Sequence, residues 1–273
     1  MRNLPIGIRN FENIIKRNYI YVDKTKKLQN LIEEGECYFL SRPEGFGKSL
    51  TLSTIEAMFR GRYAIFQGLA AATWVQNAAK HPNPVLRLDF AKLNTQTVDA
   101  FNVSLYKQLE ATAKEYALPQ TKDLETIINA LYEKYGSIAV LLANYDDPIT
   151  RIQKDNDLLL PIYNILRNFY RIIDAYRERY RFLLVLGSES YEETGIYATL
   201  KSLNDITHTE QFADIIGFTQ EELEEVLSLN NTKINYYLEK FQKYSNIVNE
   251  INFFTRHCYV IQQIFSKIFI DYQ

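Results

Sequence analysis

The chain of 273 residues contains little cysteine, histidine and glycine, and it carries no excess of either charge. Its two cysteines, Cys37 and Cys258, do not suggest a disulfide framework, and both lie in apolar contexts typical of reduced core thiols. Three histidines without a Cys/His cluster argue against a structural zinc site. Because 31 Lys and Arg face 33 Asp and Glu, a net charge of -2, the overall charge does not favour nucleic acid or an anionic membrane as a partner.

Long apolar runs are also missing. No stretch is long enough to cross a membrane, and the N-terminus lacks the apolar core and cleavage site of a signal peptide. We therefore expect a reduced, cytoplasmic protein. What the chain does have is the length for a sizeable core, in one large α/β domain or two small ones, and an abundance of aromatic residues, with 20 Tyr, 16 Phe and 1 Trp.

Short apolar runs alternate with helical patterns over most of the chain, which predicts a mainly parallel sheet flanked by helices. The expected strands are 37–40, 84–90, 138–142 and 182–186, and the expected helices are 11–16, 26–34, 49–59, 98–116, 123–135 and 158–179. From Thr219 onward the pattern is helical, and Thr219 with Glu222 forms a capping-box arrangement. We expect an α/β core at residues 1–217 and a helical C-terminal region at residues 218–273.

The scarce glycines cluster at Gly45 and Gly47, between an apolar strand and a helical pattern. Gly47, Lys48 and Ser49 match the end of the phosphate-binding Walker A motif G-x-x-x-x-G-K-[ST], whereas Arg42 occupies the first glycine position. In such a loop the backbone N–H groups surround phosphates, the lysine contacts the β and γ oxygens, and the hydroxyl reaches Mg²⁺. The alternative is a left-handed turn into a helix that carries an exposed lysine.

Residues 38–50, YFLSRPEGFGKSL, resemble the signature of the AAA-ATPase-like family, P-loop proteins often followed by a C-terminal PD-(D/E)XK nuclease-like domain. Further landmarks of that family follow in the expected order at residues 4–7, 21–25, 66–69, 88–90 and 202–207. The resemblance implies an AAA-like P-loop NTPase fold, a C-terminal region that is truncated relative to the family, and ATP and Mg²⁺ as ligands. The nucleotide would be held by Arg42, Glu44, Gly45, Phe46, Gly47, Lys48, Ser49 and Leu50. The family also has arginine at Arg42, but usually has two arginines where this chain has Glu44 and Gly45.

ATP hydrolysis in such folds requires two acids at the end of a second strand, one for Mg²⁺ and one for the attacking water. The resemblance places these Walker B positions at Ala143 and Asn144, neither of which supplies a carboxylate. Asp146 and Asp147 follow, roughly 10 to 13 Å away if the strand continued. We interpret them as a solvated turn before Pro148 rather than as substitutes, unless the chain turns back sharply.

The following strand departs from the family in a similar way. Family members place a lysine shortly after the glycine that ends this strand, and the alignment of Gly187 with that glycine puts Ser190 at the lysine's place. Glu189 beside it would repel a triphosphate. We therefore predict no catalytic residues.

Ser49, Asp89 and Asp146 are the candidate metal ligands, and the alternative for Asp89 is a structural bond to a loop N–H. For Arg42 the alternatives are a phosphate contact or a pair with a carboxylate near the first strand. Tyr19 and Tyr21 either stack on a base or belong to the core.

Three functional hypotheses follow. The first is a nucleotide-binding protein whose ATP hydrolysis is absent or weak. The second is a pseudo-ATPase that binds no nucleotide and serves as a scaffold for an unknown protein partner. The third is an active ATPase in which Asp89 or Asp146 replaces the missing metal ligand.

Overall fold

The computed structural model describes residues 2–188 except 6 and 36, and residues 200–226 except 201, 220, 223 and 224. Its centre is a five-stranded sheet in the order β2-β3-β4-β1-β5, in which every adjacent pair is parallel. The strands are β1 (Cys37–Ser41), β2 (Val85–Asp89), β3 (Ile138–Ala143), β4 (Tyr180–Gly187) and β5 (Asn204–Asp205).

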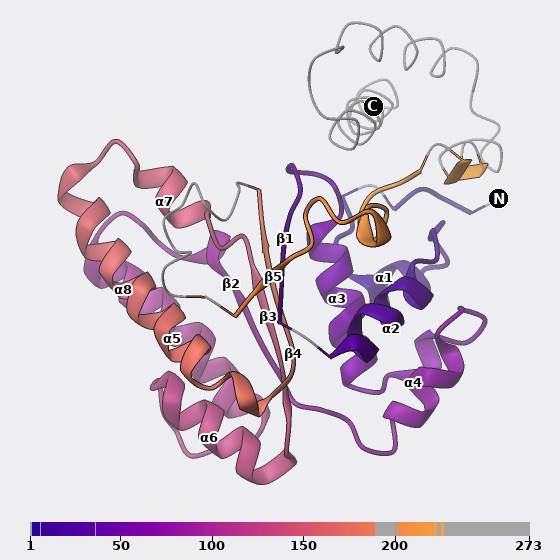
Figure 1. Cartoon of the computed structure of the whole chain (residues 1–273), viewed down its shortest axis with the longest axis horizontal. Helices are drawn as coiled ribbons and strands as arrows, with labels where there is room; N and C mark the ends of the chain where they lie inside the picture. Colours follow the sequence, from indigo (N-terminus) through magenta and orange to yellow (C-terminus); the bar gives the residue numbers. More distant parts are fainter. Residues whose placement is uncertain are drawn as a thin grey trace, which may run out of the picture.

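Helices cover both faces of this sheet (Figure 1). On one face lie α1 (Phe11–Lys16), α2 (Thr25–Glu34), α3 (Lys48–Phe59) and α4 (Ala72–Ala78), and on the other lie α5 (Val98–Glu115), α6 (Leu124–Tyr135), α7 (Asp147–Ile152) and α8 (Asn156–Ala175). The arrangement confirms the predicted α/β architecture with a mainly parallel sheet. Because parallel strands need long crossover connections, the helices between them lie across the faces of the sheet.

The strands are buried on both faces, as their continuous apolar sequences predict. Successive side chains of a strand point to opposite faces, so each strand contributes to two hydrophobic clusters. Val140 and Leu142 of β3 pack on the side of α5, α6 and α8, whereas Ala139 and Leu141 pack on the side of α1 and α3. Many of the abundant aromatic residues fill these clusters, and the fully buried ones include Tyr38, Tyr145, Tyr170, Phe11, Phe39, Phe59, Phe66, Phe90, Phe101 and Phe182.

The predicted elements agree closely with the observed ones at all four predicted strands and all six predicted helices. The capping box is confirmed too, since Glu222 N donates to Thr219 Oγ1 at 3.3 Å and Thr219 N donates to Glu222 Oε2 at 2.8 Å. The sequence patterns missed α4, α7 and the short β5. The rest of the predicted C-terminal helical region, residues 227–273, lies outside the described residues.

Two expectations about the environment of the chain are also addressed. Within the described ranges, no helix combines the length and the apolar content needed to cross a bilayer. Cys37, at the start of β1, is partly buried and takes part in no disulfide bond, while Cys258 lies outside the described residues.

The carboxyl ends of the strands meet at one edge of the sheet, where Ser41 pairs with Gly187 and Asp89 pairs with Ala143. At this edge Gly187 is in close contact with the ring of Tyr145, because a Cβ on Gly187 would lie 2.2 Å from Tyr145 Cε1. Real carbon atoms do not approach so closely, so the tyrosine ring occupies the space of the missing side chain.

We expect Gly187→Ala to destabilise the protein by about 1–3 kcal/mol, since it overpacks a site that is already filled. Equilibrium urea unfolding measures the loss. In a double-mutant cycle with Tyr145→Leu, the glycine substitution should cost clearly less once the ring is gone. An equal loss of stability in both backgrounds would show that the ring of Tyr145 is not what excludes a side chain at Gly187.

Candidate functional site

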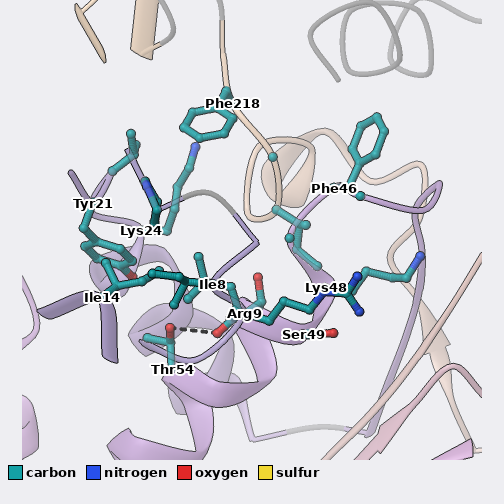
Figure 2. A pocket seen from close by; sticks show the side chains of 18 of the residues that line it. Ile8, Arg9, Ile14, Tyr21, Lys24, Phe46, Lys48, Ser49, Thr54 and Phe218 are labelled. Atoms are coloured by element: carbon teal, nitrogen blue, oxygen red, sulfur yellow. Dashed lines mark hydrogen bonds between the residues drawn. The ribbon is translucent and has the colours of Figure 1, made fainter. Parts of the chain in front are cut away.

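A cavity of about 520 Å³ opens at the carboxyl edge of the sheet, beside the glycine loop that connects β1 to α3. Figure 2 shows Tyr21, Ile14 and Lys24 on one side of it, and Phe46, Lys48 and Ser49 on the other. The N-terminal segment, residues 4–28, and the segment 215–218 supply most of its apolar walls. The cavity therefore has a polar end at the loop and an apolar end under the N-terminal segment.

The loop adopts the conformation that its glycines allow. Gly45 and Gly47 both have positive φ, at 83° and 96°, a region that side-chain-bearing residues rarely adopt. Gly47 is the residue from which α3 starts, and no side chain among the described residues caps this helix end. The first N–H groups of a helix have no partner within the helix, so the start of α3 presents donors and a partial positive charge.

Lys48 is buried, with 8% of its surface exposed, which contradicts the alternative of an exposed lysine after the turn. Its Nζ donates to Arg42 O at 2.5 Å, to Pro43 O at 3.1 Å and to Ser188 Oγ at 2.8 Å. The lysine thus joins the loop to the end of β4. Burial lowers the pKa of Lys48 to about 8, although the negative charges of Asp146 and Glu44 oppose that shift.

Arg42 is also buried, and its guanidinium donates to the main-chain oxygens of Ser41 and Thr207, both at 2.8 Å. The hydroxyl of Thr207 in turn accepts from Ser41 N at 3.1 Å. These bonds go to main-chain oxygens, and the two alternatives for Arg42, a phosphate contact and a pair with a carboxylate, both stay predictions. Arg42 joins the beginning of the loop to residues 207–213, which follow β5.

Asn144 reverses the chain immediately after β3, with a φ of 54°. Asparagine tolerates this left-handed conformation better than most residues. The reversal brings Tyr145 N to within 3.2 Å of Leu186 O, and Asp146 Oδ2 accepts from Ser188 N at 2.8 Å. The interpretation of Asp146 as part of a solvated turn is therefore wrong, since only 3% of its surface is exposed.

Asp89, at the end of β2, accepts hydrogen bonds from its neighbours in chain and in space. Its Oδ1 accepts from Ala91 N at 3.2 Å, the loop N–H predicted by the structural alternative, and from Asn144 Nδ2 at 2.8 Å. Lys92 lies 3.6 Å from Oδ2. Asp89 and Asp146 do not belong to the cavity wall, whereas Asn144 and Asp147 do.

The N-terminal segment is fixed by residues of the 21–25 landmark. Asp23 Oδ2 accepts from Ala70 N at 2.7 Å, and Thr25 Oγ1 accepts from Ala71 N at 3.0 Å, so this landmark bonds to residues directly after the 66–69 landmark. Tyr21 lines the cavity and packs edge-on against Phe11, 5.2 Å between ring centroids. Both alternatives for Tyr21 fit this position, because the ring belongs to a packed cluster and also borders the cavity.

Sequence reasoning missed several residues of the cavity. Lys24 is buried and donates to both carboxylate oxygens of Glu222, at 2.6 and 2.5 Å, across 198 positions of the chain. Arg9 and Phe218 also line the cavity (Figure 2). No sequence motif marks such partners, since only the fold brings them together. Residues on both sides of Gly217 line the cavity, and the predicted domain boundary there stays a prediction.

Two positions that the sequence analysis singled out, Glu189 and Ser190, lie outside the described residues.

Comparison with known proteins gives a family. Residues 5–197 match the sequence model of a family described as "Predicted AAA-ATPase". A protein of Azotobacter chroococcum mcd 1, described as "Uncharacterized protein in vnfD 5'region", is 29% identical over 234 residues. That match covers 83% of this chain and 45% of the relative, so the chain spans less than half of the relative's length. No solved structure matches the chain.

The lowered pKa of Lys48 predicts a specific pH dependence of stability. The unfolded chain keeps the proton of Lys48 up to its ordinary pKa of 10.5, whereas the folded protein loses it near 8. The unfolded state thus binds more protons between these values, and stability rises with pH there. Relative to Lys48→Met, the unsubstituted protein should gain about 1–2 kcal/mol between pH 7.5 and 9.5, as measured by urea unfolding. If the difference in unfolding free energy between the two proteins does not change with pH, the pKa of Lys48 is not lowered by burial.

Proposed function

The chain belongs to the AAA-ATPase-like family, and from this premise we propose that it binds ATP in the cavity beside the glycine loop and hydrolyses it weakly or not at all. The observation that carries the proposal is the combination of Gly47, Lys48 and Ser49 at an uncapped helix start that faces the cavity. The same edge of the sheet has no carboxylate at Ala143 and Asn144, where the family resemblance expects the catalytic acids.

The polar end of the cavity suits phosphates. The backbone donors at the start of α3 and the positive end of the helix dipole favour an anion. Lys48 adds a cation, and a phosphate offers it a charged acceptor in exchange for the neutral carbonyls of Arg42 and Pro43. Phe46, buried at 6% exposure, holds the loop between its two flexible glycines. Arg42 would act on the phosphates indirectly, because its guanidinium fixes the loop from behind.

The apolar end suits a nucleoside. A volume of about 520 Å³ is within the usual range for small-molecule sites, which are largely apolar with a few oriented polar groups. Ile8, Ile14 and Tyr21 offer apolar and aromatic contacts to a base, and Phe218 lines the same cavity near Lys24 (Figure 2). Leu50, in the first turn of α3, lines the same space.

The residues at the loop also fit Mg²⁺ as a companion of the nucleotide. Within the described residues, no group of three His, Cys, Asp or Glu side chains could hold a metal alone. Mg²⁺ differs from metals that need such clusters, since it keeps several waters and is usually held by substrate phosphates and one or two protein oxygens. Ser49 supplies a hydroxyl at the cavity wall, and Mg²⁺ bound there would neutralise phosphate charge.

Hydrolysis requires a group that orients and deprotonates the attacking water. A general base typically accelerates proton transfer by about 10²–10⁴-fold. Ala143 offers a methyl group, and the amide of Asn144 donates to Asp89 rather than accepting a proton from water. We therefore assign nucleotide a structural or switching role, with the chain's own residues binding and orienting it.

Two other functions stay open to the same measurements. A scaffold without nucleotide is favoured by the bonds of Lys48 to its own loop, which occupy the group that a phosphate would need. An active ATPase that uses Asp89 or Asp146 has less support, because neither aspartate lines the cavity and both carboxylates already accept hydrogen bonds, from Asn144 and from Ser188 N respectively.

ATP with Mg²⁺ should raise the melting temperature of the protein. At nucleotide concentrations about one hundred times Kd, the stabilisation is about 2.7 kcal/mol, or roughly 5–10 °C for a chain of this size. Lys48→Ala should abolish most of this shift, since it removes the cation at the loop. Lys107→Ala is the matched control, because Lys107 is exposed on α5 at the opposite face of the sheet. No shift in the unsubstituted, folded protein would reject nucleotide binding in favour of the scaffold.

Phosphate release should be slow even when nucleotide is bound. Typical enzymes turn over at about 10 s⁻¹, and the missing base predicts a rate of about 10⁻¹ to 10⁻³ s⁻¹ or less. A coupled phosphate assay under saturating ATP measures it. Rapid release that disappears in Asp89→Asn or Asp146→Asn would instead establish the active ATPase.

A further inference from the structure

The end of β3 carries no carboxylate at the two positions, Ala143 and Asn144, where the family resemblance expects acids. Ala143 pairs in register with Asp89 of β2 and Leu186 of β4, and only 4% of its surface is exposed. The next side chain, Asn144, is fixed by its hydrogen bond to Asp89. Neither residue brings a negative charge to the cavity.

The left-handed turn at Asn144 brings another acid back to this place. Asp147 N donates to Asn144 O at 3.1 Å, so α7 starts directly over the end of β3 rather than continuing away from the sheet. As a result Asp147 lines the same cavity as Lys48, Ser49 and Asn144. The two neighbouring acids, Asp146 and Asp89, do not line the cavity.

Asp147 is held by one ion pair and still borders the cavity. Its Oδ2 is buried and lies 2.6 Å from Arg151 Nε, while the residue itself belongs to the cavity wall. The side chain is 29% exposed, so it is neither sealed in the core nor fully solvated. Burial foremost raises the pKa of Asp147, the charges of Asp146 and Asp89 add to this, and Arg151 opposes it.

A divalent cation would relieve this environment. Three carboxylates, Asp89, Asp146 and Asp147, interact electrostatically near one strand end, and of these Asp147 faces the space beside Ser49. Hydrated Mg²⁺ is commonly held by a carboxylate through its water molecules together with substrate phosphates. Glu44 is the other acid among the described residues of the cavity wall, and it belongs to the glycine loop, four residues before Lys48.

We infer that Asp147 takes over the metal-orienting position that Ala143 and Asn144 vacate, by accepting hydrogen bonds from the water shell of Mg²⁺ that accompanies ATP. This inference rests on the proposed nucleotide binding. It assigns the role to the second aspartate of the Asp146-Asp147 pair, since the first is bonded to Ser188 N. Asp147 is a binding residue in this account, and no hydrolytic step depends on it.

The test compares ATP affinity with and without magnesium, by isothermal titration in buffer containing MgCl₂ or EDTA. In the unsubstituted protein Mg²⁺ should tighten ATP binding about tenfold, equivalent to ~1.4 kcal/mol. In Asp147→Asn this ratio should fall to about twofold, while the affinity for ATP in EDTA stays equal or increases because a negative charge has gone. Glu110→Gln is the matched control, since it removes one exposed negative charge on α5, away from the cavity wall, and should keep the magnesium effect.

Asp147→Ser provides a second variant, with the same expected loss, in case Asp147→Asn does not fold. A full magnesium effect in either folded variant would overturn the role of Asp147 and leave nucleotide binding intact. An equal loss in Glu110→Gln would also overturn it, because the effect would then reflect the net charge of the protein in general. If the unsubstituted protein binds no ATP in either buffer, the proposed function itself fails, and this inference fails with it.

Discussion

A buried ammonium group, that of Lys48, is the constraint on which the carboxyl edge of the sheet depends. A buried cation is costly unless its protons have acceptors, and here the acceptors come from two separate parts of the chain. Arg42 and Pro43 belong to the loop after β1, while Ser188 follows β4. Ser188 is held in turn by Asp146 from the turn after β3. One charge thus requires the ends of three strands to stay in register.

The same connection determines how the loop can respond to a ligand. Because Lys48 already bonds to the loop's own carbonyl oxygens, an anion has to exchange with these acceptors rather than enter a ready-made cradle. The exchange is favourable only for an acceptor of higher charge than a carbonyl, which describes a phosphate better than a hydroxyl or an amide. A lysine whose pKa is lowered to about 8 gains further from such an anion, since the anion restores its protonated form.

The sequence patterns predicted the sheet well because parallel strands buried on both faces appear as short apolar runs, such as Ile138–Ala143. They failed where one pattern serves two structures. The segment Asp146-Asp147-Pro148 is typical of a turn, but proline is equally suited to the first turn of a helix, and α7 forms there. The partners of Arg42 and Lys24 could not be predicted, since Thr207 and Glu222 lie 165 and 198 positions away and belong to no shared motif. For the site, the loop residues followed from the motif, whereas the cavity wall required the fold.

The pattern of kept and altered residues separates binding from turnover. Asp23 and Thr25 hold the N-terminal segment over the apolar half of the cavity through Ala70 and Ala71, and Gly47 with Lys48 forms the polar half. In the proposed function each of these residues would act on the ground state of the bound ligand, and each lies in a segment that resembles the family. Ala143 and Asn144 differ from the family where the resemblance expects the groups that act on the water and the metal during bond cleavage, and Glu44 and Gly45 differ from it in the loop. Uniform binding of substrate and transition state does not accelerate chemistry, so the first set without the second fits the proposal of a chain that holds a nucleotide and cleaves it slowly or not at all.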